Sequence, residues 1–79
     1  MSNYDSATGD AATIEIRVNG DLRKVPEGST LAEILRIMGI PADRVAVELN
    51  RDIVRKTNWE NCIVGPGSEV EIVHFVGGG

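Results

Sequence analysis

Two short segments of the chain alternate apolar with polar residues, and one segment between them carries a helical stripe instead. Residues 13–18 place Ile14, Ile16 and Val18 on one side, and residues 44–50 repeat the alternation. This period of two predicts strands that bury one face. Because a sheet with one apolar face has to be covered, the chain needs a second layer in order to fold.

The second layer is predicted between Thr30 and Gly39. Thr30 and Glu33 have the spacing of a capping box, in which the threonine oxygen accepts from the Glu33 amide and the glutamate reaches back. The residues that follow form one apolar stripe at helical spacing: Leu31, Ile34, Leu35 and Met38. Gly39, with Pro41 soon after it, is a good stop, so we expect a helix of about ten residues.

The remaining strands are delimited by turn residues. Asn19-Gly20 predicts a type I′ turn that returns residues 22–25 as an antiparallel hairpin partner. A short segment at 53–54 and a last strand at 69–76, released by the turn at 65–68, complete the order. We therefore predict an α+β fold, a mixed sheet of four to five strands with one helix across one face.

Length and composition restrict the classes of protein to which this chain can belong. With 79 residues it supports one small domain, and eight Lys and Arg against 12 Asp and Glu, spread along the chain, make nucleic acid an unexpected partner. A single cysteine, Cys62, and a single histidine, His74, are too few for a disulfide, a structural zinc site or an iron–sulfur cluster. We therefore expect that the chain itself binds no metal and no cofactor.

The chain is predicted to have a core domain between two tails. Residues 1–12 are poor in apolar side chains and are expected to be disordered, residues 13–76 to fold, and residues 77–79 to form a flexible tail. The start of the chain lacks the basic and apolar stretches of a secretory signal, so we expect a cytoplasmic protein that neither spans nor binds a membrane.

The internal side chains offer no convincing catalytic set. Cys62 stands beside Ile63 and Val64 and is expected to be a small core residue, because free cysteine is commonly buried. His74 is expected to have a structural role in the last strand rather than a role in proton transfer. Neither has the base or the orienting group that nucleophilic catalysis needs.

The three terminal glycines, Gly77, Gly78 and Gly79, have no turn or cap to make. Extended, they reach about 10 Å beyond the last strand, carry no side chain and end in a carboxylate. Such a thread can enter a narrow channel of another protein, where ATP could activate the carboxylate as an acyl-adenylate before sulfur or nitrogen attacks it. The chain would then be a substrate and carrier, and a partner would be the enzyme.

The sequence resembles a known family in four segments and in its order of elements. The order of elements and the Gly-Gly end resemble the β-grasp, ubiquitin-like sulfur carriers, and within them the ThiS family of thiamine biosynthesis. Four segments carry the resemblance: IEIRVNG (14–20), GSTLAEIL (28–35), VAVELN (45–50) and VEIVHFVGGG (70–79). The early Asn-Gly hairpin and the short helix are more similar to ThiS than to MoaD, the small subunit of molybdopterin synthase.

The resemblance implies a cycle of reactions at Gly79. A ThiF-like adenylyltransferase would adenylate its carboxylate with ATP, and a persulfide from a cysteine desulfurase or rhodanese-type donor would convert it to a thiocarboxylate. A ThiG-like thiazole synthase would accept the sulfur. Three alternatives remain open: delivery of sulfur to molybdopterin or another pathway, attachment of Gly79 to lysines as a protein modifier, and an interaction module without covalent chemistry.

A partner also needs a surface to bind. If Val70 and Ile72 face the core, then Val73 and Phe75 lie on the opposite face of the sheet and form an apolar patch that leads to the tail. We predict this patch as the docking surface. The open alternative is that the alternation slips near the end of the strand and buries Phe75.

Overall fold

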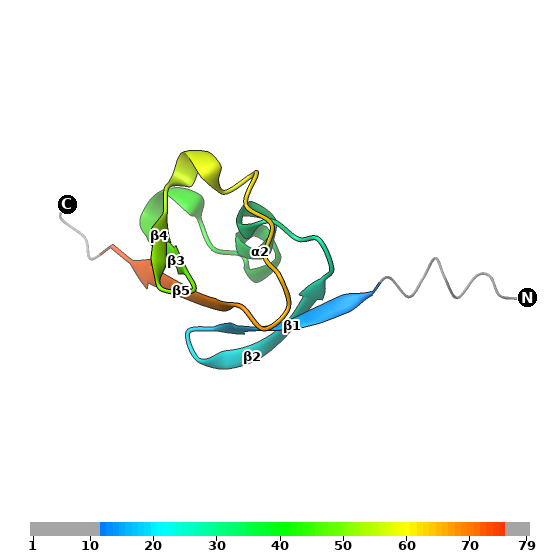
Figure 1. Ribbon diagram of the computed structural model, residues 1–79. Helices are drawn as coiled ribbons and strands as arrows, with labels where there is room; N and C mark the ends of the chain where they lie inside the picture. Colours follow the sequence, from blue (N-terminus) through cyan, green and yellow to red (C-terminus); the bar gives the residue numbers. More distant parts are fainter. Residues whose placement is uncertain (1–11, 76–79) are drawn as a thin grey trace, which may run out of the picture.

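The computed structural model describes residues 12–75, which form a five-stranded sheet with one α-helix against one face (Figure 1). The strands and the α-helix are β1 (Thr13–Val18), β2 (Asp21–Pro26), α2 (Leu31–Met38), β3 (Val45–Leu49), β4 (Asp52–Val54) and β5 (Glu69–His74). Two short 3₁₀-helices, η1 (Ala42–Arg44) and η2 (Lys56–Asn58), join them. The predicted tail at 77–79 lies outside the described residues.

The sheet has the strand order β2-β1-β5-β3-β4, so the last strand lies in the middle. β5 pairs parallel with β1 and antiparallel with β3, while β2 and β4 pair antiparallel with their neighbours. The predicted α+β fold with a mixed sheet is therefore confirmed.

The β1–β2 hairpin forms as its turn residues predict. Asn19 and Gly20 both have positive φ, 51° and 87°, as a type I′ turn requires. The strands then pair from Val18 opposite Asp21 to Thr13 opposite Pro26. Past β2, the Glu27 N–H donates to the carbonyl of Ala12 at 2.9 Å, which extends the hairpin by one bond.

Helix α2 is fixed at both ends by local contacts. Thr30 Oγ1 accepts from the Glu33 N–H at 3.1 Å and Glu33 Oε1 accepts from the Thr30 N–H at 3.0 Å, so the predicted capping box is present. Gly39 ends the helix in the left-handed conformation at φ 71°, as expected. The helix has eight residues, two fewer than predicted.

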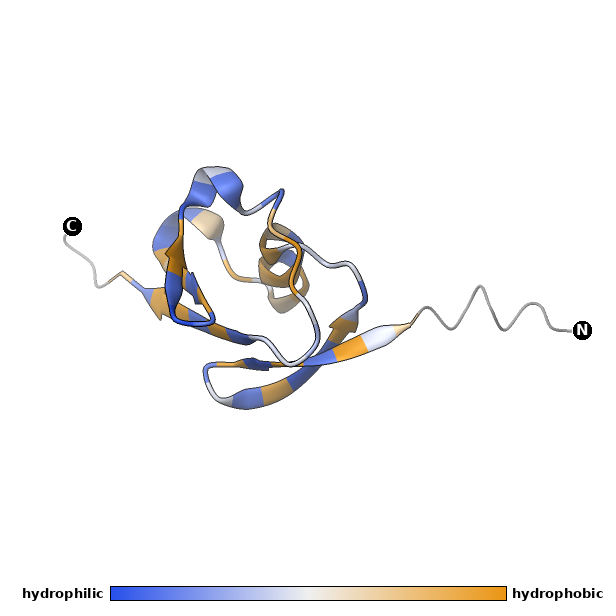
Figure 2. Cartoon of the chain, in the orientation of Figure 1, coloured by the Kyte–Doolittle hydropathy of each residue, from blue (hydrophilic) through white to orange (hydrophobic). Residues whose placement is uncertain are grey.

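The core lies between α2 and the sheet. Leu31, Ile34 and Leu35 from the helix are at most 2% exposed, and they face buried strand residues such as Val47 and Val70. Figure 2 shows the corresponding pattern, with apolar and polar residues alternating along the strands. Met38 and Cys62 are half-buried and pack against this core, in line with the expectation for both residues.

Trp59 is a core residue that the sequence pattern did not reveal. It follows η2 in a polar segment, yet it is 3% exposed, and its indole N–H donates to the Val54 carbonyl at 2.8 Å. Its burial depends on the chain between β4 and β5 folding back over the helix, where the Ala32 N–H donates to the Trp59 carbonyl. No local periodicity marks that contact.

Asn19 joins the first hairpin to the middle of the sheet. Its backbone N–H donates to the Val70 carbonyl at 2.8 Å. Its side chain bonds twice to Ile72, since Oδ1 accepts from the Ile72 N–H at 2.7 Å and Nδ2 donates to the Ile72 carbonyl at 3.2 Å. The Asn19 side-chain amide thus makes the two hydrogen bonds to β5 that the backbone of a longer β1 strand would make.

The last strand is shorter than predicted. β5 ends at His74 rather than at residue 76, although the Phe75 N–H still donates to the Arg44 carbonyl at 2.9 Å. η1, which the sequence pattern did not predict, precedes β3 and supplies that carbonyl. Val76 lies outside the described residues.

Replacing Asn19 by Ala should lower the free energy of unfolding by about 2 kcal/mol, because both polar groups of Ile72 lose their partners in a partly buried position. Urea denaturation monitored by circular dichroism measures the change. Asn19→Gly, which tolerates the positive φ, separates loss of the bonds from backbone strain. A loss below about 0.5 kcal/mol in both variants would contradict the proposed role of the amide.

Candidate functional site

The site that the structure describes is the end of β5, from which the chain continues into the predicted tail. Gly77, Gly78 and Gly79, the predicted reactive end, lie outside the described residues. The described residues therefore define where the tail begins and what surrounds its base.

Side chains along β5 alternate between the core and the outer face of the sheet. Val70 and Ile72 are 1% and 5% exposed, whereas Val73 and Phe75 are 54% and 61% exposed. The bond from the Phe75 N–H to the Arg44 carbonyl keeps Phe75 in line with the strand. Val73 and Phe75 therefore lie on the face opposite the helix, and the alternative in which Phe75 is buried is excluded.

Neighbouring strands add two more apolar residues to this face. Ala46 lies directly opposite Val73 in the β3–β5 register, and Ile53 on β4, opposite Glu48, is 76% exposed. We call Ala46, Ile53, Val73 and Phe75 the tail patch. Only Val73 and Phe75 were predicted from the sequence, because the positions of Ala46 and Ile53 depend on the strand order.

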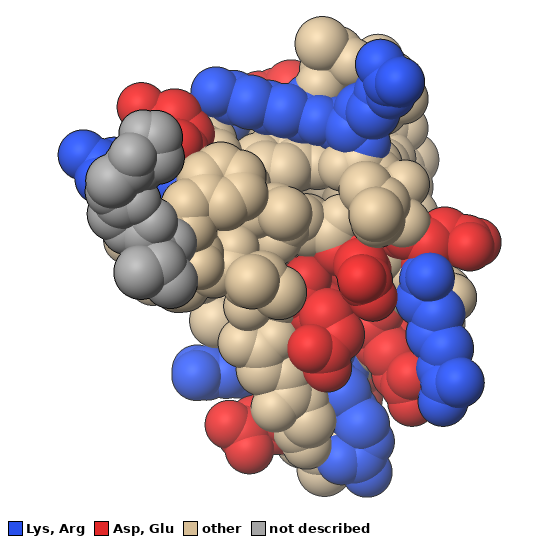
Figure 3. Space-filling model, turned by 90° about the vertical axis from the view of Figure 1, so that its left-hand side faces the viewer, with Lys and Arg blue, Asp and Glu red and all other residues tan. Residues whose placement is uncertain are grey.

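Charged residues border the tail patch on two sides. Glu48 and Glu71 form a directly opposed cross-strand pair, an arrangement that repulsion makes unfavourable for the isolated sheet. On another side, a hollow of about 350 Å³ is lined by Phe75 and Ile53 together with Arg55 and Lys56. Figure 3 shows this end of the molecule, with an uncharged area between acidic and basic side chains.

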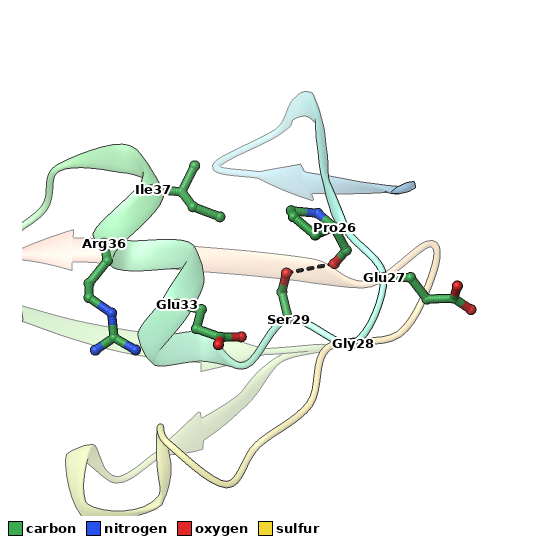
Figure 4. Close-up of a pocket in the computed structure, with 7 residues that line it drawn as sticks. All are labelled: Pro26, Glu27, Gly28, Ser29, Glu33, Arg36 and Ile37. Carbon is green, nitrogen blue, oxygen red and sulfur yellow. Dashed lines mark hydrogen bonds between the residues drawn. The ribbon is translucent and has the colours of Figure 1, made fainter. Parts of the chain in front are cut away.

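Another hollow, of about 470 Å³, lies between α2 and the β2–α2 loop (Figure 4). Ile37 of the helix, 57% exposed, lines it together with Pro26, and Ser29 Oγ donates to the Pro26 carbonyl at 2.6 Å. It lies on the helix side of the sheet, away from the tail patch.

The helix side also carries an exposed ion pair. Arg36 Nη1 lies 3.2 Å from Glu60 Oε2, and this hydrogen bond raises the pKa of the Arg36 guanidinium, which remains charged. Both side chains are more than 60% exposed, so solvent screens the pair. It carries no chemistry suited to catalysis.

Cys62 and His74, to which the sequence analysis gave structural roles, lie in different surroundings. Cys62 is half-buried and packs against the core. His74 lies on the helix side of β5, and its side chain is exposed. Within residues 12–75, no three His, Cys, Asp or Glu side chains are grouped as a metal site would require. No helix in that range is long and apolar enough to cross a membrane.

The fold and the position of the tail define the class. A mixed sheet packed on one helix, with the C-terminal strand at its centre, is a β-grasp fold, and the chain after that strand ends in Gly-Gly-Gly. The model of the ThiS family matches residues 16–79. The chain belongs to the ThiS family, and this membership supports the prediction of a sulfur carrier.

Known proteins agree with this assignment. The crystal structure of the thiamine biosynthesis protein ThiS from Geobacter metallireducens superimposes with a TM-score of 0.75 at 30% identity, covering 84% of this chain and 100% of that one. Thiazole synthases of Magnetococcus marinus and Paramagnetospirillum magneticum match 66 residues at 32% and 35% identity. These residues are 84% of this chain but 20% of each synthase, so the chain spans a fifth of their length.

Replacing Phe75 by Ser should change the free energy of unfolding by less than about 0.5 kcal/mol, because its side chain is largely exposed. The same substitution at Ile72, three residues earlier and buried, should cost about 3 kcal/mol or more. Thermal and urea unfolding of the two variants measure the difference. Equal destabilisation would contradict the placement of Phe75 on the outer face.

Proposed function

We propose that this chain carries sulfur as a thiocarboxylate on Gly79 and delivers it to the thiazole of thiamine. The observation that carries the proposal is the ThiS family match, which runs from the first strand through the last glycine. The similar structure from Geobacter metallireducens is described as a thiamine biosynthesis protein, and segments similar to 66 residues of this chain occur within thiazole synthases. Because a carrier-like segment and a synthase occur in one chain in these relatives, we favour direct transfer of sulfur from the carrier to the synthase.

The chemistry begins with activation of a poor electrophile. The Gly79 carboxylate attacks the α-phosphorus of ATP and releases pyrophosphate, so the carboxylate becomes an acyl-adenylate. The terminal sulfur of a cysteine persulfide then attacks the acyl carbon and expels AMP, giving an acyl disulfide. A second thiolate attacks the cysteine sulfur of that disulfide, which releases the thiocarboxylate and leaves a disulfide behind.

In this proposal the chain is the carrier and its partners are the catalysts. A ThiF-like adenylyltransferase binds the ATP, a cysteine desulfurase or rhodanese-type donor supplies the persulfide, and a ThiG-like thiazole synthase takes the sulfur. Gly77 and Gly78 lengthen the tail without adding side chains, so the Gly79 carboxylate can enter a narrow active site of a partner enzyme. Nothing in this cycle requires a metal or a cofactor bound by the carrier.

We assign the tail patch to docking with the adenylyltransferase. Its four apolar residues share the face of the sheet on which Phe75, the last described residue, lies. Since an extended residue spans about 3.3 Å, an enzyme that engages Phe75 would have the Gly79 carboxylate within about 10 Å to 15 Å. Glu48 and Glu71, opposed on the same face, favour a partner that brings basic residues to this border. The apolar centre and the charged rim together resemble the anatomy of a transient interface.

The intact mass of the protein purified from its native host tests the carrier proposal. A fraction of the chain should be heavier by the difference between one sulfur and one oxygen atom, and a variant lacking Gly78 and Gly79 should not show this form. Conjugates of much higher mass would indicate a protein modifier instead. A chain that keeps its biological activity without the two glycines would contradict both.

Replacing Phe75 by Ser should slow adenylation of Gly79 by about tenfold or more, because a central apolar residue of the docking surface is lost. Pyrophosphate release by a ThiF-like adenylyltransferase, measured at carrier concentrations below saturation, reports the effect. Leu22→Ser is the matched control, since Leu22 is 59% exposed on β2, away from the tail patch. Equal rates for the two variants would remove Phe75 from the docking surface.

A further inference from the structure

The two edges of β5 are paired differently along its length. On the β3 side, Asn50 donates to the Glu69 carbonyl and Phe75 donates to the Arg44 carbonyl. The odd-numbered residues of this segment therefore direct their backbone groups to β3 and to the two residues that flank it. In an antiparallel ladder the residues between them direct their N–H and C=O groups to the other edge. The backbone groups of Val70, Ile72 and His74 therefore face the β1 side.

Along the β1 side of β5, the backbone groups of Val70 and Ile72 have partners and those of His74 have none within the described residues. Val70 accepts from the Asn19 N–H, and Ile72 is paired by the Asn19 side chain. β1 itself stops at Val18 and turns into the hairpin, so it offers nothing opposite His74. In Figure 1, β5 continues past the β1–β2 hairpin toward the C-terminus.

His74 is thus the first position of β5 whose backbone edge is open. No residue in the range 12–75 pairs with its N–H or C=O on the β1 side, and its side chain is exposed. The opposite edge is closed, because Val73 pairs with β3 and Phe75 bonds to Arg44 of η1. A strand edge that is open on one side accepts an added strand through backbone hydrogen bonds.

We propose that an extended segment of the adenylyltransferase adds to β5 at this open edge, beginning at His74 beside Asn19. The inference rests on the proposed function and specifies how the enzyme would hold the base of the tail. Backbone bonds to His74 would fix the direction and register of the chain that follows. Side chains of the added strand that point to the outer face would meet Val73 and Phe75, so the apolar patch and the open edge form one continuous surface.

Charge disfavours a second copy of this chain as the occupant. The protein has a net charge of −4, and Glu71 projects from β5 three residues before His74. Edge-to-edge pairing of two copies would bring two acidic chains together, and the juxtaposition of like charges opposes association. A segment of an enzyme that carries basic residues meets no such repulsion.

Amide hydrogen exchange followed by NMR tests the inference directly. In the free chain the His74 amide should exchange at least about tenfold faster than the Val73 amide, which is paired with β3, and the Phe75 amide, which bonds to Arg44 of η1. Adding the ThiF-like adenylyltransferase without ATP should slow exchange at His74 by about tenfold or more and leave Val73 nearly unchanged. An unprotected His74 amide in the complex overturns strand addition, even where Gly79 is adenylated normally.

A matched pair of variants gives a second readout. His74→Pro removes the outward N–H but no bond to β3, whereas His74→Ala removes only the side chain. Affinity for the enzyme should fall about tenfold in His74→Pro relative to His74→Ala, with both variants unfolding cooperatively. Equal affinities of the two variants overturn the inference. If the His74 amide of the free chain becomes protected as the concentration of the chain rises, a second copy occupies the edge, and the enzyme is overturned as the occupant. Neither outcome bears on adenylation, which tests the proposed function separately.

Discussion

The position of β5 between β1 and β3 is the constraint on which the rest of the structure depends. Without it, the β1–β2 and β3–β4 hairpins would be two separate ribbons, each too small to be stable alone. Val70 and Ile72 lie beneath the helix and join both hairpins to one core, and the Asn19 amide secures the junction. The strand that completes the fold is therefore also the strand that leads to Gly79.

This arrangement gives the tail a rigid starting point. The end of β5 is paired with β3, and Phe75, directly after β5, donates to the Arg44 carbonyl of η1. The first hairpin has already left the β1 edge of β5 at this point, because β1 ends at Val18. One edge of the strand is closed and the other is open, and the outer face carries the tail patch. A partner can thus contact backbone and side chains at the base of the tail without disturbing the core, which lies on the opposite face.

The two faces of the sheet have different tasks. The inner face is covered by α2 and by the Trp59 segment and supplies the stability of the domain. The outer face is uncovered, and its opposed Glu48 and Glu71 and its exposed Ile53 and Phe75 contribute little to folding or oppose it. Features that do not favour the isolated fold are typical of functional surfaces, and here they share the face of the sheet on which Phe75 lies.

The sequence by itself determined the elements that arise from contacts between near neighbours. Alternation predicted the strands, the Thr30–Glu33 box and Gly39 predicted the limits of α2, and Asn19-Gly20 predicted the hairpin, because each depends on a few adjacent residues. The terminal glycines likewise led to the proposed reactive end without any structure. Only the tertiary structure decided that β5 lies in the middle, that Trp59 is buried, that Ala46 and Ile53 join Val73 and Phe75, and that His74 has an open edge. These features depend on pairing between residues as far apart as Asn19 and Ile72, 53 positions along the chain, and no local pattern of polarity encodes such a register.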